Sequence, residues 1–543
     1  MDILIKNGLI VDGKGTPRFK SDIAINKGAI SEIDQNIESD DNKCKMIDAS
    51  NLIISPGFID MHSHADLTIL QRNKSEAYIM QGVTTLNVGM CGIGLAPANE
   101  MVRKYYSNFV VNMFGSNKLQ LYDTLQEFMG LIEKKGISPN LAFFIPHGNI
   151  RASVLGMEDR SATIEELESM KNIIRREMEA GAFGLSTGLI YPPGIITPTE
   201  ELIELAKIVN EYNGIYDSHM RNEGTGVVDK GMAELIKIAK DANIQAQISH
   251  WKASGNFAWN LTSEMINLMI KSREEGINVY ADIYPYESSS TSLSGMLLKP
   301  WVYADFEGNL SNPKIRKRIL DEIINNLLSN FVTDISEGIS EEELIQGIIS
   351  YLMRNTTIIS VRYNKEVEGA KLEKILKSLY PNRSPFDALL DFVRDEEGSI
   401  MVSMKMMSER KSILHLYQQD FVCIGSDGII PIEGNTHPRA YGTFPKILGR
   451  YVREKKLVTL EEAIRKMTSL PASILHLKDR GIIKAGYNAD LVIFNPETII
   501  DKATYKNGCQ FPEGIDYVIV NGEITVEKGK HIGTLNGQIL KHK

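Results

Sequence analysis

The sequence is poor in the features that mark disulfide-rich, membrane-spanning and secreted proteins. It contains four cysteines in 543 residues, at the widely separated positions 44, 91, 423 and 509. Such spacing builds no disulfide framework, so a reducing cytoplasm is the expected location. No apolar run reaches about 18 residues, and the N-terminus lacks a basic segment followed by an apolar stretch. We therefore expect neither a membrane span nor a signal peptide.

A strong excess of either charge is also missing. Sixty Lys and Arg residues are balanced by 69 Asp and Glu, for a net charge of -9. This argues against nucleic acid as the main partner, because phosphate groups bind to a basic face. With 43% hydrophobic and 24% charged residues, the composition is that of a globular protein with a sizeable core. We expect neither a nucleic acid nor a membrane as partner; the oligomeric state leaves no mark in the sequence.

The two ends of the chain share a β-rich texture. Short segments such as DILIKNGLIVD near the start and ADLVIFNP and DYVIVNGEIT near the end alternate apolar and polar residues, with Asn-Gly and Lys-Gly turn signals. Chain termini often lie close together. Residues 1–55 and 481–543 could therefore pair into one small β domain, or they could form two independent caps.

The middle of the chain, residues 56–480, has a different rhythm. Short apolar strands alternate with helical stretches, for example residues 163–181, where Thr163 is a helix N-cap and Gly181 ends the helix. About eight strand–helix units indicate an α/β fold with a parallel sheet closed into a TIM-type (β/α)8 barrel. A segment at about 305–380 is helical and rich in Ile, Leu and Asn, which indicates an insertion.

Metal-ligand residues follow several of these strands. His62 and His64 flank one serine at the end of the strand LIISPGFID, so both imidazoles point to one face. Cys91, His219 and His250 each follow another apolar strand. Each alone could be a buried thiol or a hydrogen-bonded histidine. Together they offer more donors than one tetrahedral zinc ion needs, so they could hold two ions.

Asp427, in FVCIGSDG, follows a strand late in the barrel. A carboxylate at that place could be a metal ligand or a general base. It could also be a turn residue, because Asp-Gly is a common turn pair.

The chain resembles the N-acyl-D-amino-acid deacylases, or D-aminoacylases, of the metal-dependent amidohydrolase superfamily. The resemblance runs from about residue 3 to residue 530, and it implies the TIM-type barrel with a β-sandwich built from both termini. The segments that carry it follow in order along the chain: PGFIDMHSHAD, GVTTLNVGMCGIGLAP, GAFGLSTGLIYPPG, YDSHMRNEG, ISHWKASG, ADIYPYESSSTSL, IGSDG, HPRAYGTFPKILGRYVRE and RGIIKAGYNADLVIFNP.

The resemblance also implies a zinc-dependent hydrolysis of N-acyl-D-amino acids to a carboxylate and a free D-amino acid. Cys91 and His219 would hold one tight zinc ion, Asp427 would be the general acid/base, and a second, weaker metal position would be held by His62, His64 and His250. Cyclic amidases of the superfamily bridge their metals with a carboxylated lysine; here Cys91 takes that place. The substrate carboxylate would be bound by Lys252, Tyr284, Ser290 and Arg439, and His147 matches a family position near the site.

The side-chain preference is partly readable. Relatives specific for acidic D-amino acids carry an arginine shortly after the Ser/Thr run, whereas this chain continues SLSGMLLKPW without one. We therefore expect neutral or hydrophobic D-amino acids.

Three alternatives stay open at this point. The segment GLSTG at 184–188 fits a serine-hydrolase nucleophile elbow, but the prolines in the following LIYPPG oppose the helix that the elbow requires. A dihydroorotase-like or hydantoinase-like amidase, or a D-peptide dipeptidase, would use a similar barrel. A catalytically inactive scaffold relative would have lost metal ligands, but here all five positions are filled.

Overall fold

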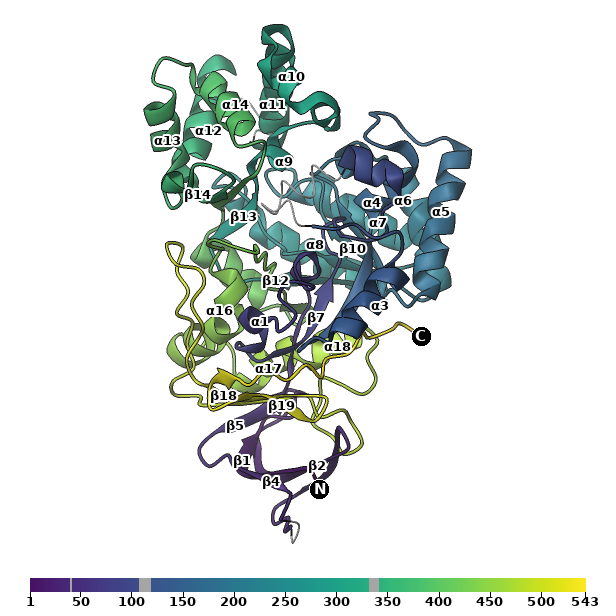
Figure 1. The fold of residues 1–543 in the computed structure, drawn as a ribbon, viewed down its shortest axis with the longest axis vertical. Coiled ribbons are helices and arrows are strands. Elements are labelled where there is room, and N and C mark those ends of the chain that lie inside the picture. Colours follow the sequence, from purple (N-terminus) through teal and green to yellow (C-terminus); the bar gives the residue numbers. More distant parts are fainter. Residues whose placement is uncertain (40–41, 107–118, 332–340) are drawn as a thin grey trace.

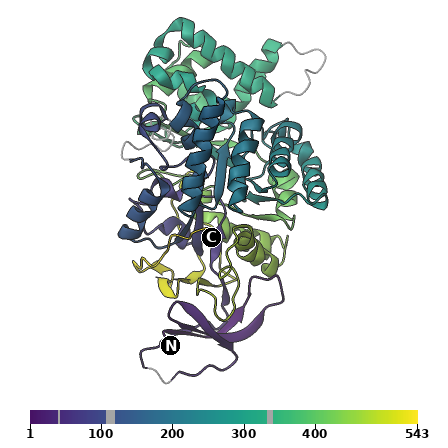
Figure 2. The ribbon, with the colours of Figure 1, turned by 90° about the vertical axis from the view of Figure 1, so that its right-hand side faces the viewer.

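The computed structural model describes residues 1–39, 42–106, 119–331 and 341–543. Three parts follow one another along the longest axis (Figures 1 and 2): a β-sheet that combines the purple and yellow ends of the chain, a barrel in the middle, and a largely helical part in green at the far end. The expected fold class, a TIM-type barrel with a β-sandwich domain built from both termini, is confirmed. The domain boundaries stay predictions.

The two ends of the chain pair directly in one nine-stranded sheet. Strand β5 from the first part of the chain lies antiparallel to β17 from the last part, with Ile54 opposite Ile493. Isoleucines from both ends form one buried cluster beneath this sheet. Its strands are β1 (Ile3–Ile10), β2 (Phe19–Asn26), β3 (Ala29–Asp34), β4 (Lys45–Asp48), β5 (Ile53–Pro56), β17 (Leu491–Phe494), β18 (Ile515–Val520), β19 (Glu523–Glu527) and β20 (Lys530–His531).

The barrel consists of eight parallel strands, most of whose residues are buried. Their order in the sheet is β16-β12-β11-β10-β9-β8-β7-β6, so neighbours in the sheet are neighbours in sequence except where the chain leaves the barrel after β12. The strands are β6 (Phe58–Asp60), β7 (Val83–Val88), β8 (Asn140–Pro146), β9 (Gly184–Gly188), β10 (Ile215–His219), β11 (Gln245–Ile248), β12 (Val279–Ile283) and β16 (Val422–Ile424).

Amphipathic helices cover the outside of the barrel. In the best-defined case, Thr163 caps the helix α5 reciprocally with Glu166, as the sequence predicts, and Gly181 follows its end at φ 109°. These helices are α1 (Glu76–Ile79), α3 (Leu125–Lys135), α4 (His147–Leu155), α5 (Ile164–Glu179), α6 (Thr199–Glu211), α7 (Ala233–Asp241), α8 (Thr262–Glu274), α15 (Leu414–Tyr417), α16 (Arg439–Lys446), α17 (Leu460–Met467) and α18 (Ser469–Ile474).

Between β12 and β16 the chain forms the helical part of Figure 1, to which the predicted insertion at about 305–380 belongs. It is not wholly helical, because it contains a three-stranded antiparallel sheet in the order β13-β15-β14. Residues 332–340 of the predicted insertion lie outside the described part of the chain. The elements are β13 (Ser288–Ser292), α9 (Leu293–Leu297), α10 (Phe306–Ser311), α11 (Pro313–Phe331), α12 (Glu341–Asn355), β14 (Thr356–Val361), α13 (Leu372–Leu379), α14 (Pro385–Asp395) and β15 (Ile400–Lys405).

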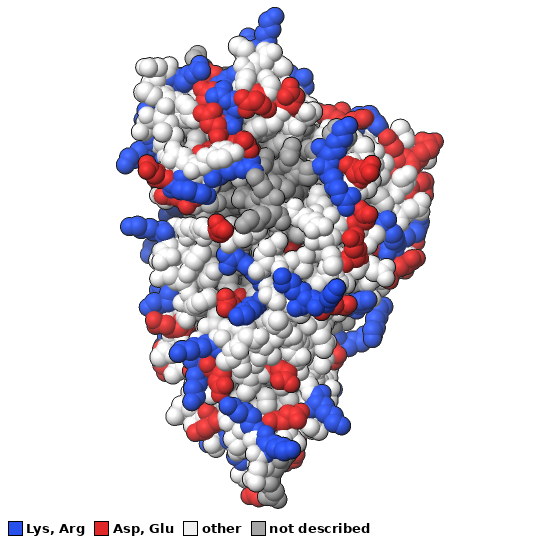
Figure 3. Space-filling model, in the orientation of Figure 1, with Lys and Arg blue, Asp and Glu red and all other residues white. Residues whose placement is uncertain are grey.

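The surface carries charges of both signs. On the face shown in Figure 3, Lys and Arg are interspersed with Asp and Glu, and neither sign forms a large patch. Within the described residues, every helix is too short or too polar to cross a lipid bilayer.

Candidate metal centre

Barrel closure brings the two ends of the barrel sequence together at the site. Strand β6 meets β16: Met61 N donates to Ile424 O at 3.0 Å. Beyond the ends of these two strands, Asp427 N donates to His62 O at 2.7 Å and His64 N donates to Gly428 O at 3.0 Å. Asp427 therefore lies beside the histidine pair although 363 residues separate it from His64 in sequence.

The turn that carries Cys91 is held by a serine of the neighbouring strand. Ser186 Oγ accepts a hydrogen bond from Gly92 N at 3.1 Å and donates to Gly89 O. Ser186 is fully buried, and no helix follows β9 directly. The hydroxyl thus braces the loop on both sides of Cys91, and the strand–turn–helix of a nucleophile elbow is not formed.

Three of the candidate residues have an unusual backbone conformation. Cys91, His250 and Asp427 have φ values of 54°, 38° and 50°, in the left-handed region that non-glycine residues rarely adopt. Such residues cost about 1–3 kcal/mol each and cluster at functional sites. Here each lies two or three residues after the end of a barrel strand, in the turn where the chain leaves the sheet.

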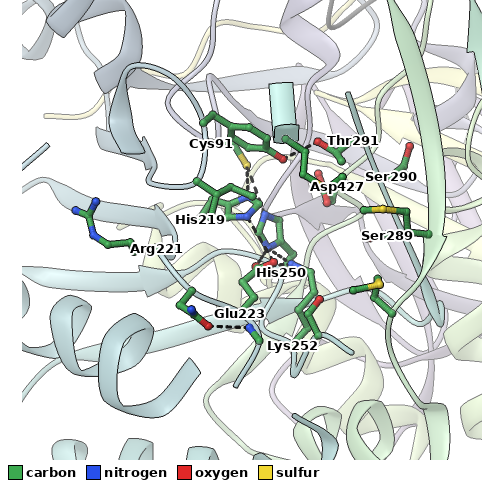
Figure 4. A pocket seen from close by; sticks show the side chains of 18 of the residues that line it. Cys91, His219, Arg221, Glu223, His250, Lys252, Ser289, Ser290, Thr291 and Asp427 are labelled. Carbon is green, nitrogen blue, oxygen red and sulfur yellow. Dashed lines mark hydrogen bonds and ion pairs between the residues drawn. The ribbon is translucent and has the colours of Figure 1, made fainter. Parts of the chain in front are cut away.

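Three imidazoles surround the sulfur of Cys91 at the barrel mouth; two of them, those of His219 and His250, are labelled beside it in Figure 4. The Cys91 Sγ atom lies 3.3 Å from His62 Nε2, 3.5 Å from His250 Nε2 and 3.7 Å from His219 Nδ1. Two ligands of one tetrahedral zinc ion, at about 2.3 Å for sulfur and about 2.0–2.1 Å for nitrogen, lie about 3.5 Å apart. The three sulfur–nitrogen spacings are close to this value, and the ligand atoms of Cys91, His62 and His250 all lie within 4.8 Å of one another, so the thiol and these imidazoles suit zinc in chemistry and spacing.

A second set of donors adjoins the first. His62, His64 and Asp427 offer ligand atoms within 4.8 Å of one another, and Asp427 Oδ1 lies 3.4 Å from His64 Nε2. His250 stands between His219 and His62, with ring centroids 4.4 Å and 4.9 Å away. The five predicted ligands therefore form one cluster, and their division between a tight and a weak position stays a prediction.

Burial controls the protonation of these groups. It raises the pKa of the Cys91 thiol well above its usual range, and it lowers the pKa of His250 to about 4. Burial alone would also raise the pKa of Asp427, but the Arg439 guanidinium and the nearby imidazoles outweigh it and hold that pKa well below the usual range. Neutral imidazoles suit metal binding, whereas the thiol needs a cation beside it to ionise.

The predicted carboxylate-binding residues fall into two groups. Lys252, Tyr284 and Ser290 line the cavity above the donors, and the Tyr284 hydroxyl has no hydrogen-bond partner among the described residues. Arg439 is fully buried and is not among the described residues that line this cavity. Its Nη1 lies 2.7 Å from Asp427 Oδ2, so its ion pair in this structure is with the candidate general base, while Nη2 donates to Ser290 O at 3.1 Å.

The cavity has a volume of about 350 Å³. Asp427 and Glu223 are the only acidic residues among the described residues that line it. Its outer wall is largely apolar and draws on both the barrel loops and the part of the chain between β12 and β16; the apolar residues are Ile93, Ile190, Ile195, Met296, Leu352, Met404, Met406 and Ile429.

Sequence reasoning missed Glu223. Its carboxylate lies 2.5 Å from Lys252 Nζ and 3.2 Å from His250 Nδ1, and it follows His219 by four residues. The four-residue spacing from His219 was the sequence signal that could have identified Glu223. His147, in contrast, is buried on α4, where its Nε2 lies 3.9 Å from Glu201 Oε1, away from the cavity lining.

Comparison with known proteins adds an independent line of observation. The model of the amidohydrolase family matches residues 414–526. The chain is 29% identical over 542 residues to a D-aminoacylase of Alcaligenes xylosoxydans xylosoxydans, covering 99% of this chain and 97% of the relative. It is also 29% identical over 523 residues to an N-acyl-D-glutamate deacylase of that organism, covering 96% and 93%.

A solved structure agrees over the whole length. The N-acyl-D-glutamate deacylase from Bordetella bronchiseptica, complexed with zinc and a phosphonate mimic of the tetrahedral intermediate, superposes with a TM-score of 0.81. The identity is 27%, covering 100% of this chain and 99% of that one.

Proposed function

We infer that this chain, which belongs to the N-acyl-D-amino-acid deacylase family of metal-dependent amidohydrolases, hydrolyses the amide bond of N-acyl-D-amino acids with zinc as its cofactor. The observation that carries this conclusion is the clustering of the Cys91 thiol, the imidazoles around it and the Asp427 carboxylate, most of which line one cavity. The full-length likeness to deacylases supports the linear N-acyl-D-amino acid as the substrate class.

We propose that His62, His64, Cys91, His219 and His250 hold the metal, with one tight zinc position at the thiolate and room for a second, weaker one. When bound, zinc supplies Lewis acidity, which lets water lose a proton near neutral pH and polarises the scissile carbonyl. The protein itself keeps bulk water away from the reaction, because these side chains are all buried.

Asp427 is the proposed general acid/base. Its Oδ1 faces the histidine pair, and Oδ2 is held by Arg439, so the carboxylate is fixed in orientation. Oδ1 takes one proton from the attacking water, whose oxygen bonds to the acyl carbon. It then delivers that proton to the amide nitrogen as the C–N bond breaks; the second proton of the water stays on the new carboxyl group and passes to the amine or to solvent, so the products are a carboxylate and a free amino acid.

The substrate's α-carboxylate is proposed to bind opposite this floor. The Lys252 ammonium and the unpartnered Tyr284 hydroxyl are donors that line the cavity, and Ser290 adds a third. Arg439 would reach the substrate only by leaving its present contact with Asp427. We therefore propose that it acts in this region chiefly by holding Asp427, and its direct contact with substrate stays a prediction.

The D-amino-acid side chain is proposed to be neutral or hydrophobic. The apolar outer wall supports this, because burial of such a side chain gains about 25 cal/mol for each Å² removed from water. Lys299 also lines the cavity and would instead favour an acidic side chain. The relatives do not decide the matter, since this chain is 29% identical to deacylases of both kinds.

The test is a panel of N-acetyl-D- and N-acetyl-L-amino acids, assayed on the zinc-loaded protein and after chelation. We expect turnover of the D series, faster for D-Met and D-Leu than for D-Glu, lost on chelation and restored by zinc. Turnover of the L series alone, or of dihydroorotate or hydantoins in preference to linear amides, would refute the assignment. Faster cleavage of N-acetyl-D-Glu would refute the side-chain preference only.

A cytoplasmic location is proposed on the sequence alone.

A further inference from the structure

Glu223 lies behind the two imidazoles that face the thiol from β10 and β11. In Figure 4 the rings of His219 and His250 stand between Cys91 on one side and Glu223 on the other. His250 turns Nε2 to the Cys91 sulfur and Nδ1 to Glu223 Oε1, at 3.2 Å. His219 has the opposite orientation: Nδ1 faces the sulfur, and Nε2 lies 3.5 Å from Glu223 Oε2. One carboxylate thus addresses the outer nitrogen of both rings.

These outer nitrogens need a partner. A neutral imidazole that binds a metal through one nitrogen carries its proton on the other, and that N–H requires an acceptor when it is buried. His219 Nε2 has no hydrogen-bond partner among the described residues, so Glu223 Oε2 is placed to accept from it after a small closure. Acceptance from His250 Nδ1 leaves Nε2 of that ring free for the metal side.

The same carboxylate anchors the predicted substrate-binding lysine. Lys252 Nζ lies 2.5 Å from Glu223 Oε1 and 2.7 Å from His250 Nδ1. An ammonium has only donors, so in this contact His250 Nδ1 is the acceptor. When Nε2 binds a metal the proton of that ring moves to Nδ1, both nitrogens become donors, and Glu223 is the acceptor placed to serve both.

The backbone around Glu223 is rigid. Its carbonyl oxygen accepts from Ser254 N at 2.6 Å, which joins the loop after β10 to the loop after β11. The side chain of the preceding Asn222 accepts from Gly224 N at 2.9 Å and from Gly226 N at 3.1 Å. Glu223 is therefore held in place before any ligand arrives.

We propose that Glu223 is a positioning residue that orders both metal-binding imidazoles and Lys252, and so links zinc affinity to the place of the substrate carboxylate. This inference rests on the proposed function. Glu223 acts through the two rings and the lysine. It accepts the outer N–H groups of His219 and His250, which commits Nδ1 of one ring and Nε2 of the other to the metal.

The test compares zinc affinity in E223Q, E223D and a matched control, E234Q, by competition with a chromogenic chelator. Glu234 is a largely buried carboxylate of α7 that binds Arg221 of the same loop at 2.9 Å; it does not line the cavity and contacts neither a proposed metal ligand nor Lys252 among the described residues. Loss of a carboxylate that orients metal-binding histidines weakens metal binding roughly 10- to 100-fold. We expect that loss in E223Q, a smaller loss in E223D, which keeps the charge, and affinity within about twofold of wild type in E234Q.

The cobalt-substituted protein supplies the second measurement. At saturating cobalt, the visible spectrum of E223Q should show the same coordination number as that of wild type, because Glu223 is not itself a ligand. Unchanged zinc affinity in E223Q, an equal loss in E234Q, or a lost cobalt ligand in E223Q would each overturn the proposal. A wild-type protein that binds zinc but cleaves no N-acyl amino acid would refute the proposed function and leave the affinity comparison valid.

Discussion

Replacing Asp427 by Asn removes the proposed proton carrier without changing the shape of the side chain. Among the described residues that line the cavity, the other carboxylate is Glu223, whose oxygens face His219, His250 and Lys252. No second base is therefore placed to substitute. General acid–base catalysis contributes about 10²- to 10⁴-fold in rate, so we expect kcat to fall by that factor, which corresponds to about 2.7–5.4 kcal/mol of barrier.

The same change also leaves Arg439 without its ion partner. Arg439 is fully buried, and removing one member of a buried ion pair costs about 3–5 kcal/mol of stability. D427N should therefore melt at a lower temperature, and activity has to be measured well below that temperature. Asp490 offers a matched control, because it pairs with the buried Arg480 in the part of the fold formed by the chain ends. D490N should lose similar stability and keep kcat.

The assay follows hydrolysis of N-acetyl-D-Met with zinc content measured on the same samples. D427N should retain its zinc, since the thiol and the imidazoles around it are unaltered. A D427N protein with kcat within tenfold of wild type would refute the general acid/base role. Loss of zinc from D427N would equally refute it, because Asp427 would then be an essential ligand.

Three further changes test other parts of the reasoning. C91S should abolish tight zinc binding, because a hydroxyl does not ionise as a thiol does, so added zinc should no longer raise the melting temperature as it does for wild type. K299M should raise the ratio of kcat/KM for N-acetyl-D-Met to kcat/KM for N-acetyl-D-Glu about fivefold, because a partly exposed ion pair contributes up to about 1 kcal/mol. An unchanged ratio would show that Lys299 does not contact the substrate side chain. T163A should cost about 0.5–2 kcal/mol of stability through the lost helix cap and leave kcat unchanged, and a loss of activity would contradict the separation of α5 from the site.

The clustering of the proposed metal ligands was predictable because it depends on local rules. A residue that directly follows a buried parallel strand lies at the carboxyl edge of the sheet, and a barrel gathers all such edges at one mouth. To place His62, His219 and His250 at this mouth, it was enough to recognise the strand that precedes each of them. The strands at the two chain ends were also accessible, since period-2 alternation is strong in both, but their union in one domain was implied chiefly by the family resemblance.

The contacts of Arg439 and Glu223 were not accessible in this way. Arg439 reaches Asp427 from the start of α16, twelve residues later, by a path that depends on how that helix packs under the barrel mouth. Glu223 depends on which nitrogen of each imidazole faces inward, and ring orientation is a tertiary property without a sequence signal. Arg439 acts through Asp427, and Glu223 acts through the two imidazoles and Lys252. Their roles can therefore be inferred only when the orientation of those neighbouring side chains is known.

Backbone strain explains how strand ends of such different sequence deliver donors to one point. A strand that simply continued past Cys91, His250 or Asp427 would send alternate side chains to opposite faces of the sheet. The left-handed φ at each of these residues bends the chain at once, so the side chain turns over the barrel mouth. Glycine would adopt this φ without strain but has no side chain to bind a metal or carry a proton. A functional side chain at these positions therefore requires the strained backbone. The surrounding structure must therefore hold these turns, and Ser186 across the Cys91 loop is one such support.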